Sequence, residues 1–212
     1  MYVDGGSTIT LVCPFKADPA NSIRWSGPPN LITLSIGLAI NPNLPDAQRS
    51  RLSISIGSNG EYNLKISNIQ LHDEGVYRCN GVTGGSLVSE DFHLIIKVPI
   101  TSVILSNQAA DENPVKVVND KNIMFTCKTN AGRPSSKIQW YIASVNITSS
   151  ASSHTDVCAT DCSDDKLISS SQLIYKGKKE DSGKIVYCTA LNIQGHGVRS
   201  SNKTIDVLCK YF

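Results

Sequence analysis

Apolar and polar residues alternate along several short segments of the chain, as they do in β-strands that have one buried face. In residues 8–13 the apolar side chains stand at every second position. Residues 51–56 and 62–66 repeat this alternation on either side of Asn59-Gly60, a dipeptide typical of the tight turn in a β-hairpin. These segments predict an all-β fold.

A cysteine, a tryptophan and a second cysteine recur with similar spacing in the two halves of the chain. The two sets are Cys13, Trp25 and Cys79, then Cys127, Trp140 and Cys188. In an immunoglobulin sandwich, strands B and F carry a disulfide between facing sheets, and the tryptophan of strand C packs against it. We therefore predict two tandem immunoglobulin-like β-sandwiches, residues 1–98 and 99–212, with one disulfide across each core.

The first domain has the features of a variable-type sandwich. The segment between Trp25 and Arg51 is long enough for an additional C′ strand and a short C″ strand. Tyr77 stands two residues before Cys79, as in a tyrosine corner. Arg51 and Asp73 are the candidates for the ion pair between the start of strand D and the E–F turn, and we interpret both as structural.

One outer face of the first domain is the predicted partner-binding surface. Strand C, residues 22–26, should place Arg24 and Ser26 outside. In the next strand, Ile32 to Ile40, we assign the smaller residues to the same outer face. Both sides of this strand carry apolar residues, so a register shift of one residue would exchange the outward-facing and inward-facing sets. The predicted face comprises Arg24, Ser26, Thr33, Ser35, Arg78, Asn80, His93 and Ile95. The alternative interpretation is that these are ordinary solvated strand residues.

The second domain departs from the first near its second core cysteine. The stretch from Asp181 to Cys188 has one extra residue, so that Val186 and not Tyr187 stands two before the cysteine. We therefore expect no tyrosine corner there. This stretch, Gly132-Arg133-Pro134 before Ile138-Gln139-Trp140-Tyr141, and Thr189 to Asn192 resemble the C2-type second domain of nectins, nectin-like synaptic adhesion molecules and nephrin-like proteins. The resemblance implies a V-type domain followed by a C2/I-type domain, and cell-surface recognition in which the membrane-distal V domain makes the contact.

Three cysteines lie outside the two core pairs. In a C2 topology, strand C′ leads to strand E at the end where the chain enters the domain, and we place Cys158 and Cys162 there, in an insertion spanning residues 149–166. The economical pairing is Cys158 with Cys162, which leaves Cys209 unpaired at the opposite end. His154 with these two cysteines falls short of a closed zinc site, so no metal is expected. Asn146 and Asn202 begin N-x-[ST] sequons and are the candidate glycosylation sites.

The cysteine content, the net charge and the distribution of histidines argue against several classes of function. Seven cysteines, four of them in core positions, indicate an oxidising compartment, and a net charge of +2 gives no argument for nucleic acid. The four histidines, His72, His93, His154 and His196, lie in different segments without a nucleophile or carboxylate motif, so we expect neither an enzyme nor a cofactor. No apolar run is long enough to span a bilayer, and no signal-peptide pattern follows Met1.

We therefore expect an extracellular chain that belongs to a longer membrane-anchored or secreted protein. The first hypothesis is an adhesion or immune-type recognition receptor whose V-type domain binds a protein partner, another immunoglobulin-type domain or a second copy. The alternatives are a secreted defence protein in which a lectin module accompanies the tandem domains, and a structural spacer within a longer array.

Overall fold

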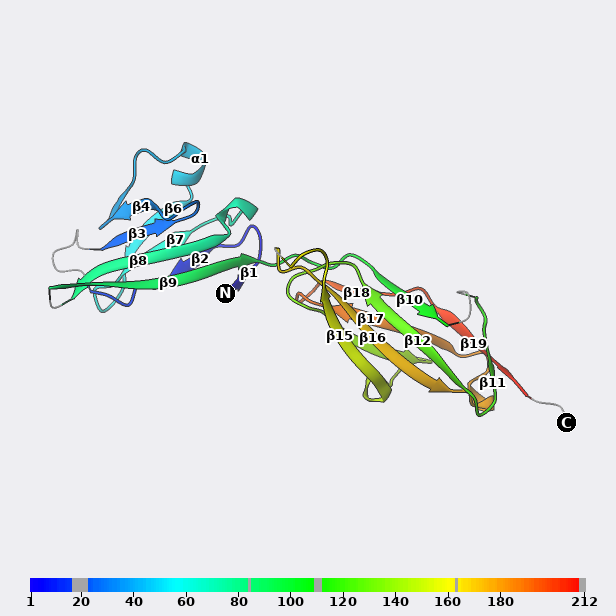
Figure 1. The fold of residues 1–212 in the computed structure, drawn as a ribbon. Helices are drawn as coiled ribbons and strands as arrows, with labels where there is room; N and C mark the ends of the chain where they lie inside the picture. The colour runs from blue at the N-terminus through cyan, green and yellow to red at the C-terminus, as the bar shows by residue number, and fades with distance from the viewer. Residues whose placement is uncertain (17–22, 84, 109–111, 163, 210–212) are drawn as a thin grey trace. The chain divides into compact units, whose positions relative to one another are not determined.

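The computed structural model describes the chain except residues 17–22, 84, 109–111, 163 and 210–212. Its strands fall into two compact units, Met1–Lys97 and Val98–Phe212, whose elements are labelled in Figure 1. The division lies one residue before the boundary expected from the sequence. Ser22, the expected start of strand C, lies outside the described residues.

The first unit is a sandwich of a six-stranded and a three-stranded sheet. The larger sheet has the order β1–β9–β8–β3–β4–β5, and the smaller has the order β2–β7–β6. The larger sheet is built from β1 (Tyr2–Val3), β9 (Ser86–Ile96), β8 (Gly75–Thr83), β3 (Arg24–Gly27), β4 (Ile32–Ile36) and β5 (Ala39–Ile40). The smaller is built from β2 (Ile9–Leu11), β7 (Tyr62–Ile66) and β6 (Leu52–Ile56). The strands β4 and β5 supply the predicted C′ and C″ strands, which confirms the variable-type architecture.

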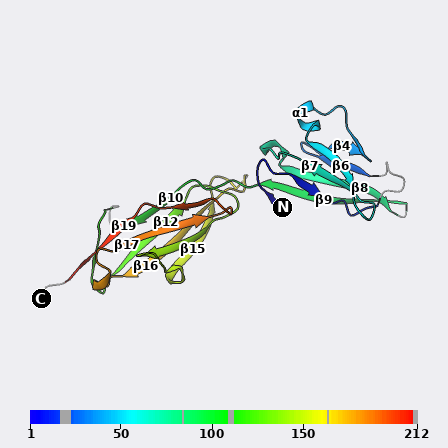
Figure 2. The ribbon, with the colours of Figure 1, turned by 180° about the vertical axis from the view of Figure 1, so that it is seen from behind.

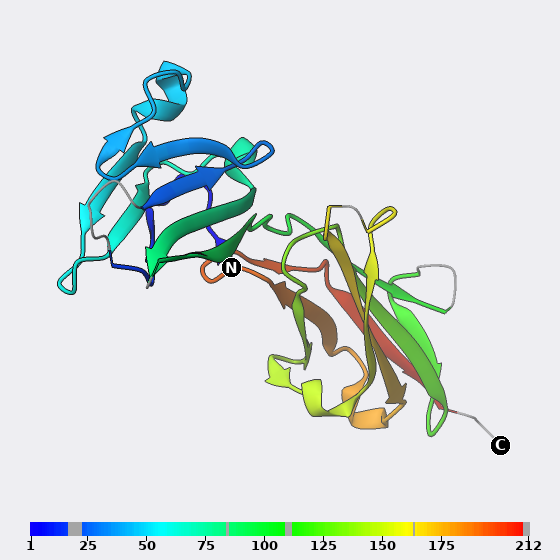
Figure 3. The same ribbon diagram turned by 60° about the vertical axis from the view of Figure 1, so that its left-hand side comes forward.

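Two short helices complete the first unit. The single turn α1 (Asp46–Arg49) has no buried residue, and it stands out from the strands of this unit in Figure 3. The 3-10 turn η2 (Leu71–Asp73) leads into β8. Between β6 and β7 the Asn59-Gly60 turn closes as predicted, because the Gly60 N–H donates to the Gly57 carbonyl at 3.0 Å and Gly60 takes a φ of 87°.

The core of the first unit surrounds Trp25 and the disulfide between Cys13 and Cys79. Trp25 is fully buried, and its Nε1–H donates to the Tyr62 carbonyl at 2.7 Å. Phe92 of β9 packs beside it, with ring centroids 5.5 Å apart. The alternation in residues 8–13 thus correctly placed Leu11 and Cys13 in the core.

A β-bulge decides which side chains of β4 point inward. In the pairing of β3 with β4, Trp25 faces Ser35 and Ser26 faces Thr33, so Leu34 is an extra residue with no partner opposite. Leu34 and Ser35 are consequently both fully buried. The prediction that Ser35 lies on the outer face was wrong, since simple alternation does not hold across a bulge.

The second unit is also a two-sheet sandwich, in which β10–β12–β16–β15 face β11–β19–β17–β13–β14, with β18 paired to β17. The first sheet contains β10 (Val103–Asn107), β12 (Asn122–Thr129), β16 (Leu167–Lys176) and β15 (Ala151–Cys158). The second contains β11 (Val115–Val118), β19 (Lys203–Leu208), β17 (Ile185–Leu191), β13 (Lys137–Ile142), β14 (Val145–Asn146) and β18 (Gly197–Arg199). The 3-10 turns η3 (Thr148–Ser150) and η4 (Lys179–Asp181) precede β15 and β17.

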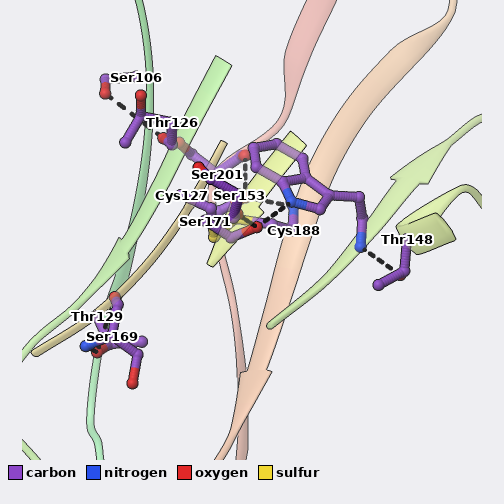
Figure 4. Close-up of a disulfide and its surroundings, with 12 residues drawn as sticks. Ser106, Thr126, Cys127, Thr129, Thr148, Ser153, Ser169, Ser171, Cys188 and Ser201 are labelled. Atoms are coloured by element: carbon purple, nitrogen blue, oxygen red, sulfur yellow. Dashed lines mark hydrogen bonds between the residues drawn. A yellow bond between two sulfur atoms is a disulfide. The ribbon is translucent and has the colours of Figure 1, made fainter. Parts of the chain in front are cut away.

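The core of the second unit surrounds Trp140 and the disulfide between Cys127 and Cys188. The Trp140 Nε1–H donates to Ser171 Oγ at 3.0 Å, and the Ser171 hydroxyl donates onward to the Ser153 carbonyl, also at 3.0 Å. Figure 4 shows Ser171 and Ser153 beside this disulfide. The buried indole N–H is thus satisfied by a side chain here, and by a backbone carbonyl in the first unit.

The segment 149–166 differs from the predicted insertion. Part of it, Ala151–Cys158, is the strand β15, which pairs with β16 along its length, and the two strands run side by side in Figures 1 and 2. It is therefore a strand of the sandwich, corresponding to strand D. Its alternation was hard to recognise because β15 is an edge strand whose side chains are nearly all exposed.

Candidate recognition face

The outer face of the larger sheet in the first unit is organised in rows of side chains. Residues directly opposite on neighbouring strands point to the same side of a sheet. One row runs from Ile36 on β4 through Arg24 on β3 and Asn80 on β8 to Ser89 on β9. Arg24 and Ile36 are exposed, and Arg24 has no ion-pair partner in the described part of the chain.

A hollow of about 550 Å³ lies along this row. Its lining residues come from four neighbouring strands and are Arg24, Ile36, Asn80, Val82, Leu87, Val88 and Ser89. Val82 and Leu87 face each other in the β8–β9 hairpin, one row beyond Asn80 and Ser89. Ile36, Val82 and Leu87 are 44%, 38% and 85% exposed. The hollow therefore combines exposed aliphatic side chains with the Arg24 guanidinium. We call these seven residues the recognition hollow.

A second row on the same face contains an ion pair. Arg78 on β8 lies opposite Asp91 on β9, and its Nε and Nη2 donate to the two Asp91 oxygens at 2.6 and 2.7 Å. Hydrogen bonding to Arg78 lowers the pKa of the Asp91 carboxyl, and the same bonds raise the pKa of Arg78. Both side chains are solvent-exposed, so the pair contributes little to stability. It fixes Arg78 within the face.

The predicted face residues are divided by the structure into three groups. Arg24 and Asn80 line the recognition hollow, whereas Thr33 and Arg78 belong to the second row. His93 and Ile95 lie farther along β9, opposite Val76 and Tyr2 respectively. Ser26 and Ser35 differ from the prediction, because neither is exposed. Ser35 faces the core. Ser26 lies in the Arg78 row and is only 6% exposed, because its short side chain lies between Thr33 on β4 and the much longer Arg78 on β8.

Sequence reasoning missed the aliphatic part of the recognition hollow. Val82 continues the alternation of Arg78 and Asn80 along β8, so extending that pattern by one step would have placed it on the face. Leu87 follows from the hairpin register only, since it becomes a face residue by pairing with Val82. Ile36 was assigned to the wrong side because of the bulge at Leu34.

The polar cluster at the start of β8 has a structural role, as predicted. Arg51 binds both carboxylate oxygens of Asp73, with Nη2 donating to Oδ1 at 2.8 Å, and both side chains are buried. The Tyr77 hydroxyl donates to the Asp73 carbonyl at 2.8 Å, which is the expected tyrosine corner. Burial of the phenol raises the pKa of Tyr77.

The remaining cysteines of the second unit follow the predicted pairing. Cys158 and Cys162 form a disulfide, so neither thiolate is available to a metal with His154. Cys209 is exposed and has no disulfide partner in the described part of the chain. Among the described residues, no three His, Cys, Asp or Glu side chains gather as a metal site requires.

The two sequon asparagines share a hydrogen-bonding pattern that suits glycosylation. Both are exposed, and each uses its Oδ1 as an acceptor: Asn146 from the Thr148 N–H at 2.9 Å, and Asn202 from Arg199 Nη2 at 2.8 Å. Neither Nδ2, the atom that carries an N-linked sugar, has a hydrogen-bond partner among the described residues. By contrast, Nδ2 of Asn192 donates to two backbone carbonyls. Glycosylation of Asn146 and Asn202 remains a prediction.

Comparison with known proteins agrees with this architecture. Residues 1–97 match the family described as "Immunoglobulin V-set domain", and residues 104–197 match "CD80-like C2-set immunoglobulin domain". The chain is 25% identical over 187 residues to cell adhesion molecule 2 of Xenopus tropicalis, covering 88% of this chain and 39% of that protein. It spans less than half the length of the curated cell adhesion molecules that it matches.

Two solved structures show the same fold over almost the whole chain. The Rst D1-D2 crystal structure aligns with a TM-score of 0.66 and 19% identity, covering 98% of this chain and 95% of that one. The mouse nectin-like molecule 4 ectodomain aligns with a TM-score of 0.62 and 18% identity, covering 98% of this chain and 66% of that one. No helix in the described residues has the length and apolar character that a membrane crossing requires.

One classification follows from the two domain matches, the two core disulfides and the C′ and C″ strands of the first unit. The chain belongs to the immunoglobulin superfamily, as a V-set domain followed by a C2-set domain.

Proposed function

We propose that this chain is the extracellular recognition part of a cell-surface adhesion or immune-type receptor, and that its V-set domain binds an immunoglobulin-type domain through the recognition hollow. The partner is a second copy of this chain or a related domain. The observation that carries the proposal is the set of exposed aliphatic side chains, Ile36, Val82 and Leu87, that line one hollow on the outer face of a sheet. Scattered exposed apolar residues are common, but contiguous ones rimmed by polar groups favour a protein contact.

The physical basis of binding would be burial of this aliphatic surface together with pairing of Arg24. Covering Leu87 alone removes a nearly fully exposed side chain from water, which favours association by roughly 1.5–3 kcal/mol for a leucine. Arg24 adds specificity, because a partner that brings no acceptor to it would leave a charge buried and unpaired. The similarity to proteins named as cell adhesion molecules supports the same class of function.

The test is association of the full chain measured by sedimentation velocity over a wide concentration range, together with binding to a panel of immunoglobulin-type ectodomains. We expect Leu87→Asp and Arg24→Glu each to weaken the association at least tenfold. The matched control is Ile56→Asp, since Ile56 is 56% exposed on β6 in the opposite sheet. Equal effects of Leu87→Asp and Ile56→Asp, or a chain that binds neither itself nor any panel member, would contradict the proposal.

A further inference from the structure

A ladder of planar side chains lies on the outer face of the second unit. Tyr141 on β13 and Tyr187 on β17 are paired opposite each other, and their rings stack with centroids 5.0 Å apart and planes 8° apart. The Arg199 guanidinium from β18 lies over the Tyr187 ring, with Cζ 3.7 Å from the centroid. Such stacking holds a guanidinium in a fixed orientation, because its flat face is attracted to the ring.

The ladder ends at a sequon asparagine. Arg199 Nη2 donates to Asn202 Oδ1 at 2.8 Å, and this fixes the side-chain amide of Asn202. An N-linked glycan is attached to Nδ2 and leaves Oδ1 as an acceptor, so the bond from Arg199 is compatible with the modified residue. The first sugar would therefore be attached close to the guanidinium, because Nδ2 and the Oδ1 atom that Arg199 binds are bonded to the same side-chain carbon.

Arg199 has binding capacity that the protein itself does not use. A guanidinium carries five N–H donors, of which the bond to Asn202 uses one. No carboxylate pairs with Arg199 in the described part of the chain. The first sugar of an N-linked glycan offers suitable acceptors in its N-acetyl carbonyl and its ring hydroxyls. One face of the guanidinium covers Tyr187, and no described residue other than Asn202 accepts a hydrogen bond from it, so the remaining N–H groups can bind a neighbouring sugar.

We propose that Asn202 carries an N-linked glycan whose first N-acetylglucosamine packs against Arg199, with Arg199 held in place by the Tyr187–Tyr141 stack. Arg199 is then a positioning residue for the glycan. The glycan shields the tyrosine pair, which keeps this face of the second unit out of protein contacts. Asn146 serves as the comparison, since its Oδ1 is bound by a backbone N–H and by no guanidinium.

The experiment is a thermodynamic cycle on the full chain secreted from animal cells. One axis is Arg199→Ala, and the other is Thr204→Val, which removes the sequon but retains Asn202 and its bond to Arg199. We expect Arg199→Ala to lower the Tm of the glycosylated second unit by roughly 2–4 °C more than it lowers the Tm of the Thr204→Val protein. Arg199→Lys should retain only part of this difference, because an ammonium lacks the planar stack.

A second measurement uses the two sequons within one molecule. Release of the glycans from the folded protein by a peptide N-glycosidase should be slower at Asn202 than at Asn146, and Arg199→Ala should accelerate release at Asn202 alone. Glycopeptide mass spectrometry gives the occupancy. An unmodified Asn202, equal Tm losses with and without the sequon, or unchanged release rates in Arg199→Ala would overturn the proposal. None of these results depends on whether the V-set domain binds a partner.

Discussion

Both units are two-sheet sandwiches, but their corresponding outer faces carry different kinds of side chains. The face of β3, β8 and β9 in the first unit presents aliphatic side chains and Arg24, which has no ion-pair partner among the described residues. The face of β13, β17 and β18 in the second presents stacked tyrosines, with Arg199 already bound to Tyr187 and Asn202. The difference teaches that one sandwich fold can carry exposed aliphatic surface on this face in one unit and side chains already bound to one another in the other.

The turn before strand F differs in a similar way between the units. In the first, Asp73 is buried and bound by Arg51. In the second, the equivalent Asp181 is half-buried, accepts from the Tyr175 hydroxyl at 2.7 Å and pairs with Lys184 at 2.7 Å. Tyr175 comes from β16, so a hydroxyl from strand E binds the turn where the tyrosine corner is absent.

The largest expected effect is the difference in stability lost when Asp73 or Asp181 is replaced by alanine. Asp73→Ala leaves the Arg51 guanidinium buried without its partner, and should lower the free energy of unfolding of the first unit by about 3–5 kcal/mol. Asp181→Ala should cost the second unit about 1–2 kcal/mol, because the Lys184 ammonium that it pairs with is partly exposed and can reach water. Denaturant unfolding followed through the indole N–H signals of Trp25 and Trp140 measures each unit separately. Equal losses would mean that burial does not distinguish the two turns.

Disulfide removal compares a long closed loop with a short one. On the chain-entropy model, Cys13→Ala with Cys79→Ala should cost the first unit about 4 kcal/mol, and Cys158→Ala with Cys162→Ala should cost the second about 2 kcal/mol. The separations of 66 and 4 residues account for the difference. The midpoints of unfolding in denaturant give both values, and a larger loss from the short loop would show that this bridge supports more than its own segment.

A direct test of the two faces introduces the same charge into each. Leu87 and Leu191 are exposed leucines on the outer faces of the first and second units, 85% and 41% exposed. Leu87→Asp should weaken association at least tenfold, which corresponds to about 1.4 kcal/mol or more, and Leu191→Asp should leave it unchanged. Sedimentation velocity of both variants decides between them. Loss of association in the Leu191 variant alone would reverse the assignment of the binding face.

Acid should weaken the second unit through Asp181. Although burial opposes it, hydrogen bonding from Lys184 and Tyr175 lowers the net pKa of this carboxyl below that of the unfolded chain. Its contribution to stability is therefore fully present above the unfolded pKa and is lost as the pH falls through the folded pKa. Unfolding of wild type and Asp181→Asn between neutral pH and pH 3 should show a smaller loss for the variant in the Trp140 signal. Identical pH profiles would remove Asp181 as the cause.

The smallest expected effect concerns the bulge in β4. The Ser35 hydroxyl is buried and has no hydrogen-bond partner among the described residues. Ser35→Ala removes an unsatisfied polar group, and should raise the free energy of unfolding of the first unit by roughly 0.5–1 kcal/mol. Thr33→Ala, on the half-exposed outer side of the same strand, is the control and should change little. A destabilised Ser35→Ala would indicate that the hydroxyl has a partner in solution.

Much of the fold was predictable because its signals are local or rigidly spaced. The Cys–Trp–Cys sets predict two facing sheets, and the Asn59-Gly60 dipeptide predicts a hairpin. The position of Tyr77, two residues before Cys79, predicts the tyrosine corner in which its hydroxyl binds the preceding turn. The outer face was less predictable. Ser35 was misplaced because a bulge interrupts alternation without an obvious sequence signal, and β15 was taken for an insertion because an exposed edge strand has no clear apolar period.

The sequence by itself determined the number of sandwiches, their order and the two core disulfides, because the Cys–Trp–Cys spacing fits facing sheets in each half. It also indicated Cys158–Cys162 as the economical pairing and Arg51 with Asp73 as the candidate ion pair, and the structure contains both. Only the tertiary structure decided that Ile36, Val82 and Leu87 meet beside Arg24, and that Arg199 joins Tyr187 to Asn202. The physical reason is that cross-strand neighbours are set by register, which depends on bulges and hairpin pairing over the whole sheet and not on any single segment.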